Sequence, residues 1–116
     1  MHEMALAESV REIVEDAAAR QGCSRVCRVI LEIGELASVE VDALLFCLEV
    51  VLRESVAAGA AIDVESKPGL GWCMACAETV PIARRFDPCP RCGGYQVEPV
   101  SGTEMRVREL EIEPVK

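Results

Sequence analysis

Residues 73–92 read CMACAETVPIARRFDPCPRC, in which twelve residues separate two Cys-x2-Cys pairs. The first pair is Cys73 with Cys76 and the second is Cys89 with Cys92. Each pair places two sulfurs on a tight turn, and two such turns can complete a tetrahedron of thiolates around one metal ion. The spacing therefore predicts a four-cysteine metal site.

Three kinds of site use such cysteine pairs. A thioredoxin-like redox site needs one pair that opens a helix within a strand-helix-strand unit, whereas here two pairs lie in a proline-rich stretch. A rubredoxin-like iron site suits the sequence Cys-Pro-Arg-Cys-Gly at residues 89–93, but the segment lacks the aromatic packing expected around such a centre. Structural zinc agrees best with the pattern. About 28 residues cannot bury enough apolar surface to fold alone, so zinc would supply folding free energy.

The sequence on both sides of this module is typical of an α/β protein. Apolar residues at helical spacing predict a helix over roughly residues 5–21 and a second one from an N-cap at Ser38 to about residue 55. Period-two alternation predicts strands over residues 27–33, 62–65 and 103–112. We therefore expect a small mixed three-stranded sheet with two helices, interrupted by a zinc-ribbon-like module.

This order of elements predicts a discontinuous first domain. We expect residues 1–69 and 98–116 to form the α/β domain, and residues 70–97 to form a four-cysteine zinc-binding domain. The other three cysteines, Cys23, Cys27 and Cys47, have no ligand spacing, and we expect them to be buried as small apolar side chains.

Composition excludes several classes of partner. The 116 residues include 12 basic and 20 acidic side chains, and the formal net charge of -8 repels nucleic-acid phosphates. No apolar run approaches the roughly 20 residues that cross a bilayer, and the N-terminus does not resemble a signal peptide. We therefore expect a cytoplasmic protein with neither nucleic-acid binding nor membrane insertion.

The single histidine is residue 2, within Met1-His2-Glu3. A histidine at this position by accident is one interpretation. The other is chelation, because the α-amine, the amide nitrogen of residue 2 and the imidazole of residue 2 can close two fused rings around one ion. The amide nitrogen of Glu3 can add a fourth donor, and planar nitrogen donors suit Ni(II) or Cu(II) better than zinc.

Several motifs in this order resemble the HypA/HybF family of hydrogenase nickel-incorporation proteins. They are Met1-His2-Glu3 with residues 6–9 (LAES), residues 31–36 (LEIGEL), the two cysteine pairs, and residues 101–107 (SGTEMRV). The match extends over essentially the whole chain, and the combination is far more specific than any single motif.

The resemblance implies a nickel metallochaperone that serves the apo large subunit of [NiFe]-hydrogenase together with the GTPase HypB. It implies transient nickel at Met1, His2 and Glu3 in the discontinuous domain. It also implies structural zinc at the four paired cysteines. Some relatives have histidines beside the zinc cysteines; this sequence has none, so a role for such histidines does not transfer.

Glu40 lies at the offset where some relatives have a carboxylate near the nickel, which makes it a candidate auxiliary residue of the nickel site. It can equally be a solvated first-turn residue of the second helix. The sequence contains no Ser/His/Asp set and no phosphate-binding glycine loop, and we expect no enzymatic activity. The alternative function is a zinc-ribbon adaptor that binds other proteins without delivering nickel.

Overall fold

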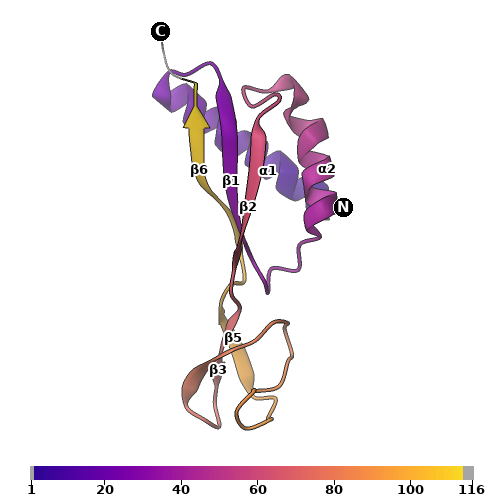
Figure 1. Cartoon of the computed structure of the whole chain (residues 1–116), viewed down its shortest axis with the longest axis vertical. Helices are drawn as coiled ribbons and strands as arrows, with labels where there is room; N and C mark the ends of the chain where they lie inside the picture. The colour runs from indigo at the N-terminus through magenta and orange to yellow at the C-terminus, as the bar shows by residue number, and fades with distance from the viewer. Residues whose placement is uncertain (1, 114–116) are drawn as a thin grey trace. The chain divides into compact units, whose positions relative to one another are not determined.

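The computed structural model describes residues 2–113 (Figure 1). Six strands form two three-stranded sheets, with the orders β2-β1-β6 and β4-β3-β5. The expected α/β class, with two helices, a three-stranded sheet and an inserted four-cysteine module, is confirmed. The elements are α1 (His2–Gln21), β1 (Val26–Gly34), α2 (Val41–Val51), the 3-10 turn η1 (Leu52–Glu54), β2 (Ala61–Lys67), β3 (Leu70–Cys73), β4 (Glu78–Pro81), β5 (Val97–Ser101) and β6 (Met105–Ile112).

The chain divides into two compact units. Of the described residues, 2–31, 39–64 and 107–113 belong to unit 1, and 32–38 and 65–106 belong to unit 2. In this division residues 32–38, 65–69 and 98–106 group with the cysteines, while the domain boundaries expected from the sequence, 1–69 with 98–116 and 70–97, remain a prediction. Residues 32–38 group there through Leu36, which is 1% exposed and packs with Cys73, Val80, Ile82 and Cys89.

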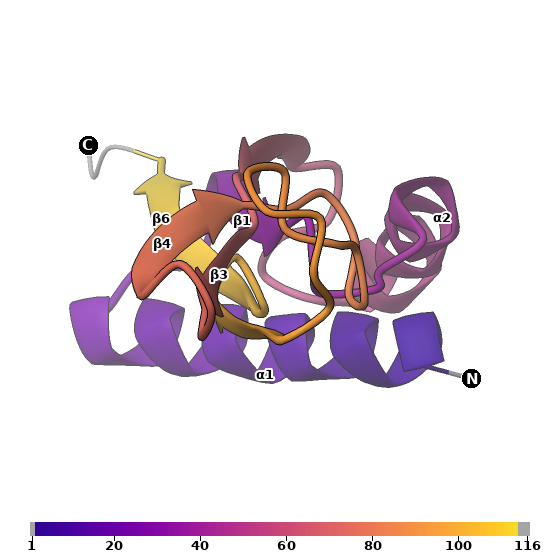
Figure 2. The same cartoon turned by 90° about the horizontal axis from the view of Figure 1, so that it is seen from below.

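In unit 1, α1 covers one face of the strands and packs against α2 (Figures 1 and 2). Its buried residues Ala7, Val10, Val14 and Ala18 recur every three or four positions, as the inward face of an amphipathic helix does. Ile13, an apolar residue of the same predicted helix, is 49% exposed. No helix within residues 2–113 combines the length and the apolar character that a membrane span requires.

The start of α2 differs from the sequence prediction. Ser38 has a left-handed φ of 57°, whereas an N-cap residue has an extended backbone, so Ser38 does not cap the helix. Glu40 occupies the N-cap position with φ -79° and ψ 101°, and its carbonyl accepts the N–H of Leu44. Its side chain makes no capping hydrogen bond, so α2 begins without help from its own N-cap carboxylate.

β1 buries Val29, Leu31 and Ile33, as the alternation predicted. The prediction that Cys27 is buried on the same face is wrong: Cys27 is exposed, and its thiol donates to the carbonyl of Glu111 at 3.3 Å. Burial at this end of the strand passes to Val26. Of the other unpaired cysteines, Cys47 is buried and Cys23 is half-buried.

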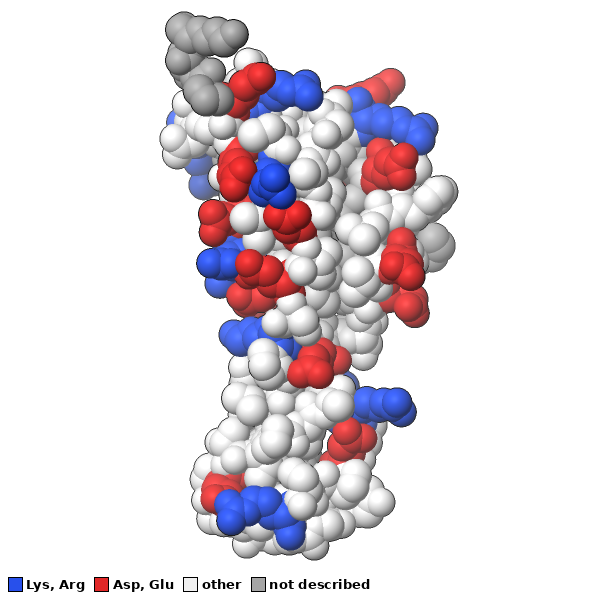
Figure 3. All heavy atoms as spheres, viewed as in Figure 1, with Lys and Arg blue, Asp and Glu red and all other residues white. Residues whose placement is uncertain are grey.

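The opposite face of these strands is charged, and Figure 3 shows basic and acidic side chains interleaved over it. Arg28 on the central strand binds Asp63 of β2 at 2.7 Å and Glu111 of β6 at 3.1 Å. These exposed ion pairs join neighbouring strands, but each contributes little stability in water. Unit 1 therefore depends mainly on its apolar interior.

Unit 2 contains the second sheet and a crossing of three backbone segments. Gly34 N–H donates to the carbonyl of Glu104, and Leu36 N–H donates to that of Gly102. A Cβ on Gly34 would lie 2.0 Å from the carbonyl oxygen of Gly102, which itself has a φ of 74°. Only glycine allows the segments to approach so closely.

Candidate metal centre

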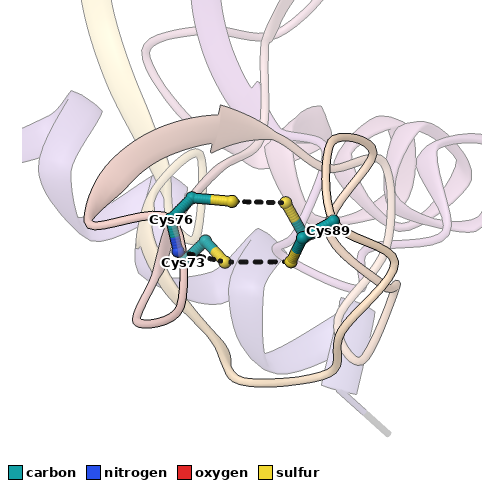
Figure 4. A group of neighbouring side chains, drawn as sticks. Cys73, Cys76 and Cys89 are labelled. Atoms are coloured by element: carbon teal, nitrogen blue, oxygen red, sulfur yellow. Dashed lines mark hydrogen bonds between the residues drawn. The ribbon is translucent and has the colours of Figure 1, made fainter.

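Four cysteine sulfurs converge in unit 2 (Figure 4). Cys73 ends β3, Cys76 lies in the turn that follows, and Cys89 and Cys92 come from the second turn. The Sγ atoms of Cys73 and Cys92 are 3.7 Å apart, those of Cys76 and Cys89 are 3.9 Å apart, and all four lie within 4.8 Å of one another. A tetrahedral zinc site with Zn–S bonds of about 2.3 Å has S–S edges of about 3.8 Å. The cluster has the dimensions to hold a metal such as zinc.

Backbone N–H groups point at these sulfurs. Cys76 N–H donates to Cys73 Sγ at 3.4 Å, Arg91 N–H to Cys89 Sγ at 3.3 Å, and Gly94 N–H to Cys92 Sγ at 3.4 Å. Such bonds stabilise sulfur in its thiolate form, which is the form that coordinates metal.

Each turn ends on a left-handed residue four positions after its first cysteine. Ala77 has φ 52° and Gly93 has φ 74°, and their N–H groups donate to the carbonyls of Cys73 and Cys89 respectively. The two pairs therefore share one backbone form, although only the second turn has a glycine there. This repetition explains why two separate segments present their sulfurs alike.

Two of the four thiols have opposite pKa shifts. The backbone N–H of Cys92 is the main cause that lowers the pKa of Cys89 to about 7, while hydrogen bonding to the thiol of Cys92 is the main cause that raises the pKa of Cys76 to about 12. Four sulfurs this close cannot all ionise without a cation, and a divalent ion removes that conflict. Four protein donors would fill a tetrahedral site and leave no position for substrate.

Unit 1 brings together two of the residues implied for nickel. His2 Nδ1 lies 3.3 Å from Glu3 Oε2, and the same carboxylate oxygen accepts the backbone N–H of Glu40 at 3.4 Å. Met1 lies outside the described residues. The hydrogen bond to His2, followed by bonds to the N–H groups of Glu3 and Glu40, lowers the pKa of Glu3 below its ordinary 4.5.

Glu40 enters this group through its main chain. Its N–H contacts Glu3, while the residue is exposed and its carboxylate has no hydrogen bond or ion pair among the described residues. The side chain of His2 is 58% exposed, and that of Glu3 is 18% exposed. An incoming ion can reach the imidazole, whereas Glu3 is already engaged with α2.

Sequence reasoning missed the residues that support the cysteine cluster. The carboxylate of Glu35 accepts the N–H of Gly69 at 3.1 Å, and Arg85 Nε donates to the carbonyl of Leu36 at 3.1 Å. Residues 31–36 (LEIGEL) stand out in the sequence as a motif, but the sequence alone places them in the first domain. Leu36 is the apolar residue of that motif that packs on Cys73 and Cys89.

Together these features define an α/β metal-handling protein, with a closed thiolate cluster in one unit and an exposed histidine at a helix start in the other. The family model described as "Hydrogenase/urease nickel incorporation, metallochaperone, hypA" matches residues 1–112. The chain belongs to this HypA family, whose members are nickel metallochaperones of hydrogenase maturation.

Relatives and solved structures agree with this assignment. The hydrogenase maturation factor HypA of Azoarcus sp. strain BH72 is 69% identical over 95% of this chain and 96% of the relative. That of Dechloromonas aromatica strain RCB is 57% identical over 97% and 100% respectively. The solution structure of the Ni metallochaperone HypA from Helicobacter pylori has a TM-score of 0.71 at 25% identity and covers 95% of this chain and 96% of its own. A second solution structure of a HypA protein gives 0.72 at 26% identity, with 97% of each chain covered.

Proposed function

We propose that this protein binds Ni(II) at its N-terminus and transfers it by ligand exchange to the apo large subunit of [NiFe]-hydrogenase, without catalysing a reaction. Met1, His2 and Glu3 supply the nitrogen donors, and nickel is the cargo. The observation that carries the proposal is that α1 begins at His2, with the imidazole in solvent.

A helix start suits nitrogen ligation by the main chain. The first N–H groups of a helix have no carbonyl partner within the helix, so an amide of residue 2 or 3 can release its proton to water and bind a metal through nitrogen without breaking a helical hydrogen bond. The positive end of the helix dipole also favours the anionic form of such an amide. Glu3, whose carboxylate binds the N–H of Glu40, fixes this end of α1 beside the start of α2. Glu40 is proposed as an auxiliary residue near the nickel.

Zinc is proposed as the resident structural ion of Cys73, Cys76, Cys89 and Cys92, with residues 70–97 as its binding domain. Their S–S distances and the N–H groups aimed at them support this choice. Purified protein should be colourless and contain one zinc per chain. A red preparation with stoichiometric iron would contradict the zinc assignment.

The proposed partners are the GTPase HypB and the hydrogenase large subunit, met in the cytoplasm. The family to which the chain belongs supports both partners, and the net charge of -8 disfavours nucleic acid. A zinc-ribbon adaptor that binds other proteins without delivering nickel is the second candidate. It is favoured by the closed thiolate site alone and needs no ligand at residue 2.

The deciding experiment is a Ni(II) titration of untagged protein, followed by absorbance and native mass spectrometry. His2→Ala, or an extension of two residues before Met1, should abolish stoichiometric nickel binding and hydrogenase maturation while zinc content stays the same. The same two residues added at the C-terminus are the matched control. Undiminished nickel binding by the N-terminally altered proteins would overturn the N-terminal site, and undiminished maturation would favour the adaptor.

A further inference from the structure

A groove of about 770 Å³ lies between α1 and the end of α2 in unit 1. Residues of α1, among them Ser9 and three glutamates, line one side, and Val50 lines the other. Arg11 also lines the groove, and its guanidinium binds Glu15 of the same helix at 3.2 Å and the carbonyl of Val51 in α2 at 3.2 Å. The bond to Val51 joins the two helices at the groove.

Apolar side chains at the groove are left in solvent. Val50 is 40% exposed, and Phe46, one helical turn earlier on the same side of α2, is 66% exposed. Ile13 of α1 is 49% exposed and lies in a depression that shares Glu12 and Glu15 with the groove. Val50 in the groove, with Phe46 one turn away and Ile13 in the adjoining depression, gives an exposed apolar surface of the kind that another chain covers.

The charge of the groove indicates which kind of partner chain could bind there. Four carboxylates, Glu8, Glu12, Glu15 and Glu54, line it together with two guanidinium groups, those of Arg11 and Arg53. Arg11 is already paired with Glu15 and bonded to the carbonyl of Val51. Glu8 and Glu12 have no basic partner within residues 2–113, and α1 presents both one turn apart.

We infer that this groove docks a basic amphipathic helix of a partner protein. Apolar residues at i, i+3 or i+4, and i+7 of the incoming helix cover Phe46 and Val50, while its Lys or Arg residues pair with Glu8 and Glu12. The lining begins at Ala5, three residues and about 4.5 Å along the helix axis from His2. The bound helix therefore lies beside the proposed cargo site, and the inference rests on the proposed function for the partner's role.

The test uses the full chain and two synthetic fluorescent helical peptides of equal length, one built from Leu and Lys and the other from Leu and Glu. Fluorescence anisotropy should show binding of the Leu/Lys peptide and at least about tenfold weaker binding of the Leu/Glu peptide. Raising salt from about 50 mM to about 200 mM should weaken the former, because it screens the exposed carboxylates. Equal binding of both peptides would overturn the choice of a basic occupant.

Matched variants distinguish peptide binding in the groove from non-specific electrostatic attraction of a basic peptide to an acidic protein. The double change Glu8→Gln/Glu12→Gln should weaken the Leu/Lys peptide about tenfold, whereas Glu98→Gln/Glu104→Gln, with the same charge change in unit 2, should not. Phe46→Ala should weaken it similarly, and Tyr95→Ala, which truncates an aromatic residue that is 75% exposed, should not. Equal losses in variant and control would overturn the groove.

The same variants give two further readouts. Glu8→Gln/Glu12→Gln should keep full Ni(II) binding, because neither residue belongs to the proposed nickel site. If the unmodified protein fails to bind nickel, the proposed function is overturned, but the result of the peptide experiment still stands. Sedimentation should give the same mass for the unmodified chain and Phe46→Ala. A dimer that Phe46→Ala dissociates would assign the groove to a second copy and overturn the inference.

Discussion

The two units have interiors of different chemistry. The interior of unit 1 is aliphatic, with Val10, Val14, Leu31, Leu44 and Leu48 all completely buried. The buried cluster of unit 2 has five members, and two of them are the thiols Cys73 and Cys89. Buried apolar area can stabilise the first, whereas the second has too little of it and needs a metal bonded to its thiols. One short chain thus combines two sources of stability, and each can be removed separately.

Metal removal should produce the largest difference in stability between the two units. Chelation, or the change Cys73→Ser, should unfold unit 2 and leave unit 1 folded, because structural zinc supplies about 10 kcal/mol of apparent folding free energy in small sites. Two-dimensional NMR reports each unit separately. Cys27→Ser, at an exposed cysteine outside the cluster, is the control and should change neither unit. Well-dispersed unit 2 resonances after complete metal removal would show that its apolar cluster suffices.

The change Gly34→Ala should cause the next largest loss of stability, and it should also act on unit 2. The new methyl group would lie 2.0 Å from the carbonyl oxygen of Gly102, so the crossing of backbone segments has to open, at a cost of about 4 kcal/mol or more. Gly22→Ala is the control: φ is 64° there and no atom lies within 4 Å, so only about 1 kcal/mol of backbone strain is expected. Chemical denaturation of the zinc-loaded protein measures the loss of unfolding free energy in both variants. Equal losses would show that the crossing of backbone segments does not require glycine at position 34.

Truncation of the aliphatic interior should have an intermediate effect, confined to unit 1. Leu48→Ala removes a side chain that is 0% exposed and should cost about 3 kcal/mol through lost burial and an unfilled cavity. Denaturation monitored by unit 1 resonances gives the value. Val50→Ala, on the exposed side of the same helix, should cost much less. A similar loss for both would mean that α2 does not pack as described.

Loss of the Glu3 carboxylate should have the smallest effect, visible only as a change with pH. The folded state holds the pKa of Glu3 below 4.5, so the carboxylate stabilises unit 1 above its unfolded pKa and this contribution disappears as pH falls through the lower folded value. Glu3→Gln should therefore make stability flatter than in the unmodified chain between about pH 5 and pH 3. Metal-free thermal melts across this range test it, with Glu8→Gln as the matched loss of a carboxylate. If Glu8→Gln changes the pH dependence of the melting temperature and Glu3→Gln does not, the stabilising role of the Glu3 carboxylate is contradicted.

The sequence predicted the elements well where apolar periodicity alone decides them. The helix containing Val10 and Val14 and the strand containing Val29 and Leu31 both have a repeat that the interior requires. The prediction for Cys27 failed because burial shifts to Val26 at the start of β1, and the same residue type fits solvent when its thiol bonds a neighbouring strand. Local alternation does not contain that information.

The metal ligands and their support differ in the same way. Cys73, Cys76, Cys89 and Cys92 could be grouped from spacing because each pair forms its own local turn. Leu36 and Arg85 could not, since they meet only when segments 49 residues apart in the chain come together. The hydrogen bond from the Glu40 N–H to Glu3 spans 37 residues and was equally invisible, although both residues had been singled out.

The division of the chain also fixes the order in which the protein can mature during synthesis. Unit 1 includes α1, which is synthesised before the paired cysteines, and residues 107–113, which are synthesised after them, so its sheet cannot be completed until β6 has left the ribosome. The paired cysteines of residues 73–92 precede β6, and residues 32–38, which pack on them, precede both. All residues of unit 2 except 105 and 106, which begin β6, are therefore synthesised before that strand. A metal ion can be captured by the four cysteines on the nascent chain, while unit 1 is completed only after translation has passed β6.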